Sequence, residues 1–302
     1  MTSSARLLPG AGSPARLRGM SKPNDDTLIA LPFGALHKWH GQMREAFARV
    51  DEPDALHYLA SAFGHLVGIE SVMISLEHKD RPPQLLYQRG IAEQYQVSII
   101  ERYFSGGYLL DPFCLAVEQD LAQGFYHLEE IAPDDFFDSE YYRTYYLKAG
   151  CSEDSYYIVN TGNETKISVS LFQGFSNESL RVDQLNLLRA VEPLVSEFIG
   201  AFSQRGMQRI AEIQCVQAVG EGDDLKQRVQ WAFEHFGSDL LTDREREVAH
   251  MVLRGHSVKS TASQLGISPE TVRMHRKNLY LKLEVGSQSE LFALFIEWLR
   301  KH

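Results

Sequence analysis

The side chains that could do chemistry in this sequence form two groups, one basic and one rich in tyrosine. The basic group lies near the C-terminus, where Arg273 and Lys277 are four residues apart in a predicted helix. That spacing places both on one helical face. Arginine can bind guanine through two hydrogen bonds, and lysine can reach bases or phosphates. This face therefore predicts contact with DNA.

Four helices are predicted between residues 242 and 300, and they position this basic face. Thr242 and Glu245 form a capping box at the start of the first helix. Gly266 supplies a tight turn before the third helix, which begins at Ser268. The third helix carries an apolar stripe that must pack inward, made of Val272, His275, Leu279 and Leu283. A short helix, a glycine turn and a helix with one buried and one basic stripe predict a helix-turn-helix.

This stretch resembles the LuxR-type DNA-binding domain over most of its length. The resemblance rests on the run from Leu241 to Val248 and then on Gly255, Ala262, Leu265, Ile267, Ser268, Thr271, Val272, His275, Asn278, Lys282 and Leu283. In that family, the positions of Arg273, Met274 and Lys277 read bases, and those of Lys259, Thr271 and Lys282 contact phosphates. The fourth helix mediates dimerisation there, and here it carries Leu291, Leu294, Phe295 and Trp298. The resemblance implies a homodimer on an inverted-repeat operator of double-stranded DNA.

The distribution of charge agrees with a DNA-binding C-terminal end. The whole chain has a net charge of −10. Residues 238 to 302 hold ten Lys/Arg and eight Asp/Glu, so their balance is +2 and the remainder carries −12. Because a duplex attracts basic surface, only the C-terminal end is a plausible DNA face.

The second group is a concentration of aromatic side chains in the front half. Between Tyr95 and Tyr157 there are 15 Phe or Tyr in 63 residues, against 11% aromatic residues overall. Tyr142, Tyr145 and Tyr146 share a face of a predicted helix over Ser139–Lys148. A buried tyrosine hydroxyl needs a hydrogen-bond partner, so this density suggests a pocket for a small molecule more than a plain core.

A stretch with Tyr103, Tyr108 and Asp111 resembles the aromatic-to-Asp-Pro segment of acyl-homoserine-lactone sensors. There the Asp accepts a hydrogen bond from the ligand amide, and the aromatic rings pack over the ligand. Here the spacing from tyrosine to Asp111 is one residue short, and the tryptophans of those sensors are absent. The resemblance implies a diverged effector pocket. An Asp111 or Asp154 carboxylate beside several tyrosine faces could instead hold an amine.

Other interpretations of the same residues remain open. Asp111 is also a good N-cap before Pro112, and the tyrosine run could be a dimer surface. The acidic pairs Asp134-Asp135 and Glu153-Asp154 are expected to be solvated loop residues. The front domain as a whole could be a protein–protein interaction module that holds no small ligand.

The sequence divides into four parts. Residues 1–30 are expected to be a disordered tail, and translation could start at Met1 or at Met20. Residues 31–204 are expected to form a ligand-sensing and dimerisation domain. A linker with a short helix over 224–236 is expected at 205–238, and the helix-turn-helix domain at 239–302. The expected fold class is α+β. An N-terminal α/β/α sandwich of the GAF or PAS type precedes an all-α, four-helix domain. One long helix over 178–204 is expected to close the sandwich.

Several classes of protein are excluded by what the sequence lacks. It has no apolar run long enough for a membrane span, no signal peptide, and three cysteines without a disulfide pattern, so a cytoplasmic protein is expected. It has no phosphate-binding glycine motif, nucleophile–base motif or phospho-acceptor strand, and no metal site or cofactor is expected. The prediction is a transcription regulator, not an enzyme, with DNA, a small effector and RNA polymerase as partners.

Overall fold

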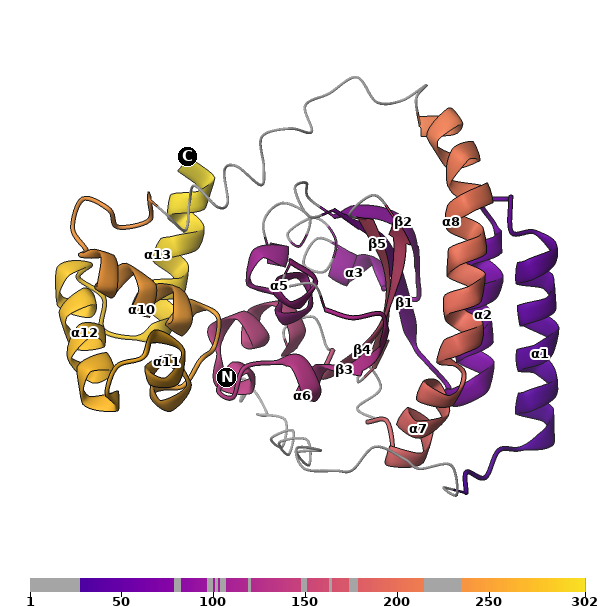
Figure 1. Ribbon diagram of the computed structural model, residues 1–302, viewed down its shortest axis with the longest axis horizontal. Coiled ribbons are helices and arrows are strands. Elements are labelled where there is room, and N and C mark those ends of the chain that lie inside the picture. Colours follow the sequence, from indigo (N-terminus) through magenta and orange to yellow (C-terminus); the bar gives the residue numbers. More distant parts are fainter. Residues whose placement is uncertain are drawn as a thin grey trace, which may run out of the picture.

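The computed structural model describes residues 28–78, 83–96, 100, 103, 107–118, 121–147, 151–162, 165–173, 179–214 and 235–301. Figure 1 shows an antiparallel sheet with helices on both faces, and a separate group of helices at the C-terminal end. The predicted fold class, an α/β/α sandwich followed by an all-α domain, is confirmed. The N-terminal tail to residue 27 and the segment 215–234 lie outside the described residues. The structure therefore does not test the short helix expected there or the choice between Met1 and Met20.

The sheet contains five strands in the order β2-β1-β5-β4-β3, and each neighbouring pair is antiparallel. β4 and β5 form the hairpin that the turn sequence Thr161-Gly162-Asn163 predicts, and Gly162 takes a φ of 85° there, a conformation that glycine adopts without steric cost. The strands are β1 (Ser71–His78), β2 (Gln84–Arg89), β3 (Gly124–His127), β4 (Glu153–Gly162) and β5 (Thr165–Gln173).

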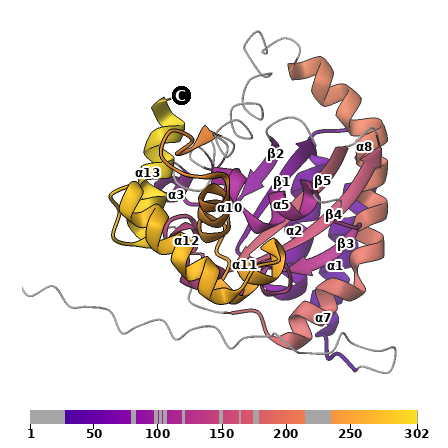
Figure 2. The ribbon, with the colours of Figure 1, turned by 60° about the vertical axis from the view of Figure 1, so that its left-hand side comes forward.

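One face of the sheet is covered by helices and is almost wholly apolar. Figures 1 and 2 show α1 (Phe33–Ala48), α2 (Ala55–Val67) and α8 (Glu192–Gln214) on the side away from the C-terminal domain. Phe63 of α2 stacks on Tyr157 of β4 with ring centroids 5.4 Å apart, and Trp39 of α1 packs on Phe63. We call this the outer face of the sheet; it holds most of the domain's hydrophobic core.

The helix expected over 178–204 is two helices, α7 (Val182–Ala190) and α8. They meet at Val191, two residues before Pro193. Proline has no backbone N–H and clashes with the preceding turn, so it is tolerated only near the start of a helix. Pro193 is therefore the signal in the sequence for this break.

The linker expected from residue 205 is also corrected, because α8 continues to Gln214. Gly206 lies inside this helix and is buried. A Cβ there would stand 2.6 Å from the ring of Phe202 and 2.8 Å from the carbonyl oxygen of Val50. Glycine therefore lets α8 approach the end of α1 closely, so this glycine serves packing and does not end the helix.

The opposite, inner face of the sheet is covered by short helices. The Ser139–Lys148 helix of the sequence analysis contains a π-helical turn, η4 (Tyr142–Tyr146). The other inner-face elements are α3 (Glu93–Gln96), η2 (Gly107–Leu110), α5 (Pro112–Glu118), α6 (Leu128–Ile131) and η3 (Phe136–Asp138).

The C-terminal domain has the four predicted helices, α10 (Asp243–Leu253), α11 (Val258–Leu265), α12 (Pro269–Lys282) and α13 (Gln288–Lys301). The predicted caps are present. Glu245 accepts a hydrogen bond from the Thr242 backbone at 2.9 Å, and Ser268 accepts one from the Thr271 backbone at 3.1 Å. Gly266 has a φ of 65° between α11 and α12, as the turn requires.

Candidate functional site

Helix α12 presents the side chains that the sequence analysis assigned to base contacts. Val272 and Leu279 are buried and hold the helix against α10 and α11. On the other side Arg273, Met274 and Lys277 are exposed, and 52% of Met274 is accessible. A large exposed methionine between two cations is a poor choice for a plain solvent face but suits contact with a base edge.

The residues expected to contact phosphates differ in their exposure and in their hydrogen-bond partners. Lys259 is exposed near the start of α11. Thr271 is half-buried, and its hydroxyl lies 3.0 Å from that of Ser268. Lys282 donates a hydrogen bond of 2.7 Å to the buried carboxylate of Glu245, which also belongs to the capping box of α10. Lys282 thus ties α12 to α10, and this structural role stands beside any contact with DNA.

The four apolar residues of α13 divide into two pairs. Leu291 and Phe295 are 0% exposed, and the ring of Phe295 lies 5.2 Å from that of Phe236, so these two side chains belong to the domain's own core. Leu294 and Trp298 are only partly buried. A dimer surface on α13 would therefore consist of Leu294 and Trp298 rather than all four residues.

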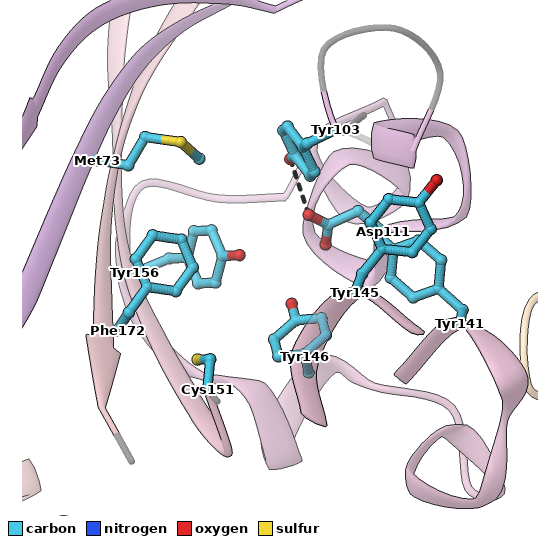
Figure 3. Close-up of a pocket in the computed structure, with 9 residues that line it drawn as sticks. All are labelled: Met73, Tyr103, Asp111, Tyr141, Tyr145, Tyr146, Cys151, Tyr156 and Phe172. Atoms are coloured by element: carbon cyan, nitrogen blue, oxygen red, sulfur yellow. Dashed lines mark hydrogen bonds between the residues drawn. The ribbon is translucent and has the colours of Figure 1, made fainter. Parts of the chain in front are cut away.

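A small cavity of about 20 Å³ lies between the inner face of the sheet and the tyrosine-rich segment (Figure 3). The residues that line it come from β1, β4, β5, the region around α5 and the segment around η4. They are Met73, Tyr103, Asp111, Tyr141, Tyr145, Tyr146, Cys151, Tyr156 and Phe172. This is room for about one water molecule, so a larger ligand can enter only if the lining side chains move.

Four of the six residues expected to bind a ligand meet at this cavity: Tyr103, Asp111, Tyr145 and Tyr146. Tyr108 is buried with its ring centroid 6.3 Å from that of Tyr103, but it does not line the cavity. Nor does Tyr142, whose hydroxyl donates to the carbonyl of Ser152. The tyrosine run is no dimer surface, because Tyr141, Tyr142 and Tyr146 are at most 5% exposed.

Sequence reasoning missed five lining residues: Met73, Tyr141, Cys151, Tyr156 and Phe172. Tyr141 was missed because the helix was assumed to be a regular α-helix, in which residues three and four apart share a face. In the π-helical turn the hydrogen bonds join residues five apart, so Tyr141 and Tyr146 both reach the cavity. Tyr156 and Phe172 could have been found from strand alternation, since neither belongs to the outer face.

Asp111 is held in place by two hydrogen bonds. Oδ1 accepts from the backbone N–H of Phe113 at 2.9 Å, which confirms the expected N-cap of α5. Oδ2 accepts from the hydroxyl of Tyr103 at 2.7 Å. Burial raises the pKa of this carboxyl to about 7, although both hydrogen bonds favour the ionised form. An ionised carboxylate has room for about four acceptor contacts, so Asp111 retains capacity toward a ligand.

The segment before η4 also contacts the C-terminal domain. Asp134, expected to be a solvated loop acid, is instead half-buried and accepts hydrogen bonds from the backbone N–H and the hydroxyl of Ser257, the N-cap of α11. The N–H of Asp135 donates to the carbonyl of Gly255 at 3.1 Å. A Cβ on Gly255 would stand 2.9 Å from Cα of Phe136, so only glycine allows this approach.

Phe136 connects this contact to the cavity. It is fully buried, and its ring centroid lies 5.9 Å from that of Tyr146 and 6.0 Å from that of Tyr141. The apolar side chains of the inner face and those of the C-terminal domain accordingly form one continuous hydrophobic cluster. On the same side, Ser289 at the start of α13 donates a hydrogen bond to Glu140 at 2.8 Å.

Comparison with known proteins gives matches to both parts of the chain. Residues 239–295 match the family described as "Bacterial regulatory proteins, luxR family". A putative HTH-type transcriptional regulator of Aeromonas salmonicida is 34% identical over 189 residues, which cover 63% of this chain and 94% of that protein. The transcriptional regulatory protein UhpA of Salmonella typhimurium is 51% identical over 61 residues, which cover 20% of this chain and 31% of UhpA.

Two solved structures are similar in outline. The VqsR LBD domain of Pseudomonas aeruginosa is 26% identical, covers 57% of this chain and 98% of its own, and has a TM-score of 0.48. Escherichia coli SdiA is 16% identical, covers 86% of this chain and 96% of its own, and has a TM-score of 0.40. Among the helices of the described residues, none is long and apolar enough to cross a membrane.

The replacement Asp111→Asn should remove a pH-dependent loss of stability. Because the pKa of the carboxyl is about 7 in the folded protein against 3.8 ordinarily, the folded state binds more protons than the unfolded state between these values. This contribution to stability is complete below the lower value and is lost as pH rises toward the upper one. Relative to the wild type, the variant should gain up to about 4 kcal/mol between pH 4 and pH 7.

Urea unfolding at several pH values measures this difference. Asp183→Asn is the control, since this acid is exposed and paired with Arg181. A difference between Asp111→Asn and the wild type that stays constant with pH would contradict the raised pKa.

Proposed function

This chain belongs to the luxR family of bacterial transcriptional regulators, and from this premise we propose that it binds operator DNA as a dimer under the control of a small effector. Its relatives are regulators of transcription, not enzymes. In the proposal, α12 enters the major groove, and the cavity beside η4 holds the effector. The observation that carries it is the continuous packing from that cavity through Phe136 to the helix-turn-helix.

The DNA-binding part of the proposal is supported by the exposure of α12. Arg273 and Lys277 would read base edges together with Met274, while Lys259 and Thr271 would hold phosphates on either side. The ion pair of Arg273 with Glu270 is 3.2 Å long and exposed, so it contributes little and can be exchanged for a base. Lys282 would have to share its charge between a phosphate and Glu245.

Dimerisation is proposed through the exposed part of α13, with Leu294 and Trp298 at the contact. Two copies related by a two-fold axis would place two α12 helices on the half-sites of an inverted repeat. The regulator would act in the cytoplasm and contact RNA polymerase where it activates transcription.

Control by the effector is proposed to pass through the segment 133–146. The same segment lines the cavity with Tyr141, Tyr145 and Tyr146 and fixes the turn before α11 through Asp134. A ligand that moves η4 would change the fit of Phe136 against Gly255. It can shift the arrangement of the domains only by the difference in its affinity for the two arrangements, typically 1–3 kcal/mol.

Replacing Arg273 by alanine should weaken binding to the operator by about 1–3 kcal/mol, because a bidentate contact to guanine would be lost. The operator can be obtained by selection from random duplexes with the wild-type protein, and affinity measured by fluorescence anisotropy at fixed salt. The matched control is Arg44→Ala, which removes the same charge from an exposed site on α1. Equal loss in both variants, or none in either, would contradict the docking of α12.

Native mass spectrometry of freshly purified protein should release one small molecule per subunit. Tyr145→Ala should lower its affinity at least about tenfold, since Tyr145 lines the cavity and stacks on Tyr141 at 4.7 Å. Tyr58→Ala is the control, because Tyr58 is a half-buried tyrosine of α2 that packs with the outer-face core.

If nothing is released, and thermal-shift screens of acyl lactones, amines and aromatic acids also show no binding, effector control is wrong. The front domain is then better explained as a protein–protein interaction module, and the DNA-binding proposal is judged on α12 alone.

A further inference from the structure

Two buried acids lie on the inner face of the sheet, beside the strand residues that line the cavity. Met73 and Phe172 line the cavity, and side chains two or four residues apart on a strand share a face. Glu77 therefore lies on the same face of β1 as Met73. Asp154 is the cross-strand partner of Phe172, so it too lies on the inner face. With Asp111 from the opposite wall, three buried carboxyl groups surround one region, and the residues that line the cavity include no Lys or Arg.

These three acids differ in the hydrogen bonds that their carboxyl groups accept. Glu77 accepts hydrogen bonds of 2.7 Å from the hydroxyls of Ser75 and Ser168. Asp111 is held by Tyr103 and by the backbone of Phe113. Asp154 is 0% exposed, and among the described residues neither of its carboxylate oxygens has a hydrogen bond of good geometry, although the Tyr156 hydroxyl and the backbone of Ser155 and Leu171 lie near enough to favour its ionised form. Solvated loop acids were expected at Glu153 and Asp154, and this expectation is wrong because both are buried.

A buried carboxylate without a good hydrogen bond lowers the stability of the fold, so a partner that pairs with Asp154 would be bound favourably. Leaving a buried polar group unpaired costs several kcal/mol, and more for a charge. Two further buried groups near it also lack a partner among the described residues, the hydroxyls of Ser170 and Tyr141. Ser170 is opposite Tyr156 in the β4–β5 register and so shares the inner face. Tyr141 lines the cavity itself. One of the three groups therefore lines the cavity, and the other two lie on the sheet face beside it.

The tyrosines supply the other half of the site. Figure 3 shows the rings of Tyr146 and Tyr156 beside the open space, with their hydroxyl oxygens directed into it, and Asp111 on the far side. The face of an aromatic ring attracts an organic cation, and several rings around one point act together. A site with buried carboxylates, ring faces and no basic side chain in its lining would repel an anion.

We propose that the effector is a small organic amine whose ammonium group pairs with Asp154 between the tyrosine rings, and whose other end reaches toward Asp111. This inference rests on the proposed function, of which it names the ligand class. The cavity of about 20 Å³ must widen to admit an arylalkylamine, and it would have to widen further for a long acyl chain.

The first test uses the wild-type, full-length protein and isothermal titration calorimetry. The probes are tyramine and 2-phenylethylamine, each compared with its N-acetyl derivative, in which the charge is removed and the ring kept. The aromatic acid 3-(4-hydroxyphenyl)propanoate and N-octanoyl-homoserine lactone complete the panel. We expect at least one free amine to bind, and its acetylated form and the acid to bind at least tenfold more weakly.

The second test is Asp154→Asn, which keeps the shape of the side chain and removes its charge. We expect the affinity for the amine to fall at least tenfold while the melting temperature is unchanged or higher, because an unpaired buried acid is removed. The control is Asp183→Asn, the same change at an exposed acid, which should bind the amine as the wild type does. If Asp154→Asn does not fold, the selectivity of the wild type for free over acetylated amine decides the matter.

Three results would overturn the proposal. These are no binding by either amine at 1 mM, equal binding of amine and acetylated amine, or unchanged amine affinity in folded Asp154→Asn. Binding of the neutral lactone alone, or release of a neutral molecule in native mass spectrometry, would reject the amine and leave effector control standing. An empty cavity in all assays would reject both.

Discussion

The arrangement of the two domains depends on the burial of Phe136. Its ring packs against two tyrosines of the cavity wall, and its backbone lies against Gly255 of the C-terminal domain. Complete burial of a phenylalanine contributes about 1.5–3 kcal/mol. That is similar to the free energy by which effectors usually bias a two-state protein. Hydrogen bonds between Asp134 and Ser257, between Asp135 and Gly255 and between Glu140 and Ser289 reinforce this contact, so the proposed control would require the whole segment to move against the C-terminal domain.

The two faces of the sheet differ in polarity. The stability that the apolar outer face provides allows the inner face to keep buried polar groups. The outer face is a continuous apolar core formed with α1, α2 and α8. The inner face carries Glu77, Asp154 and Ser170 in positions where an apolar side chain would stabilise the fold more. Buried polar groups without compensation are commonly found where a protein binds something. Stability is thus concentrated on the outer side, and the inner side retains groups that a ligand can satisfy.

Much of the fold could be predicted from local signals in the sequence. The caps at Thr242 and Ser268, the turn at Gly266 and the β4–β5 hairpin each follow from a few neighbouring residues, and all are present. What could not be predicted depends on contacts between distant segments. The burial of Asp154 follows from the register of β4 against β5, and Asp134 is satisfied by Ser257, 123 residues away. Both acids look like solvated loop residues to any argument that uses only their neighbours in sequence.

At the cavity too, some features could be predicted from the sequence and others could not. Density of tyrosine was enough to indicate a pocket, because hydroxyl groups are poor core residues without partners. Which tyrosines face the pocket depended on one π-helical turn, which exchanges Tyr142 for Tyr141 on the lining. That turn also directs the hydroxyl of Tyr142 to the backbone of Ser152, whereas the hydroxyl of Tyr141 has no hydrogen-bond partner among the described residues. Since π-helical turns occur preferentially at functional sites, the irregularity that defeated the periodic prediction is itself an argument that this wall of the cavity has a function.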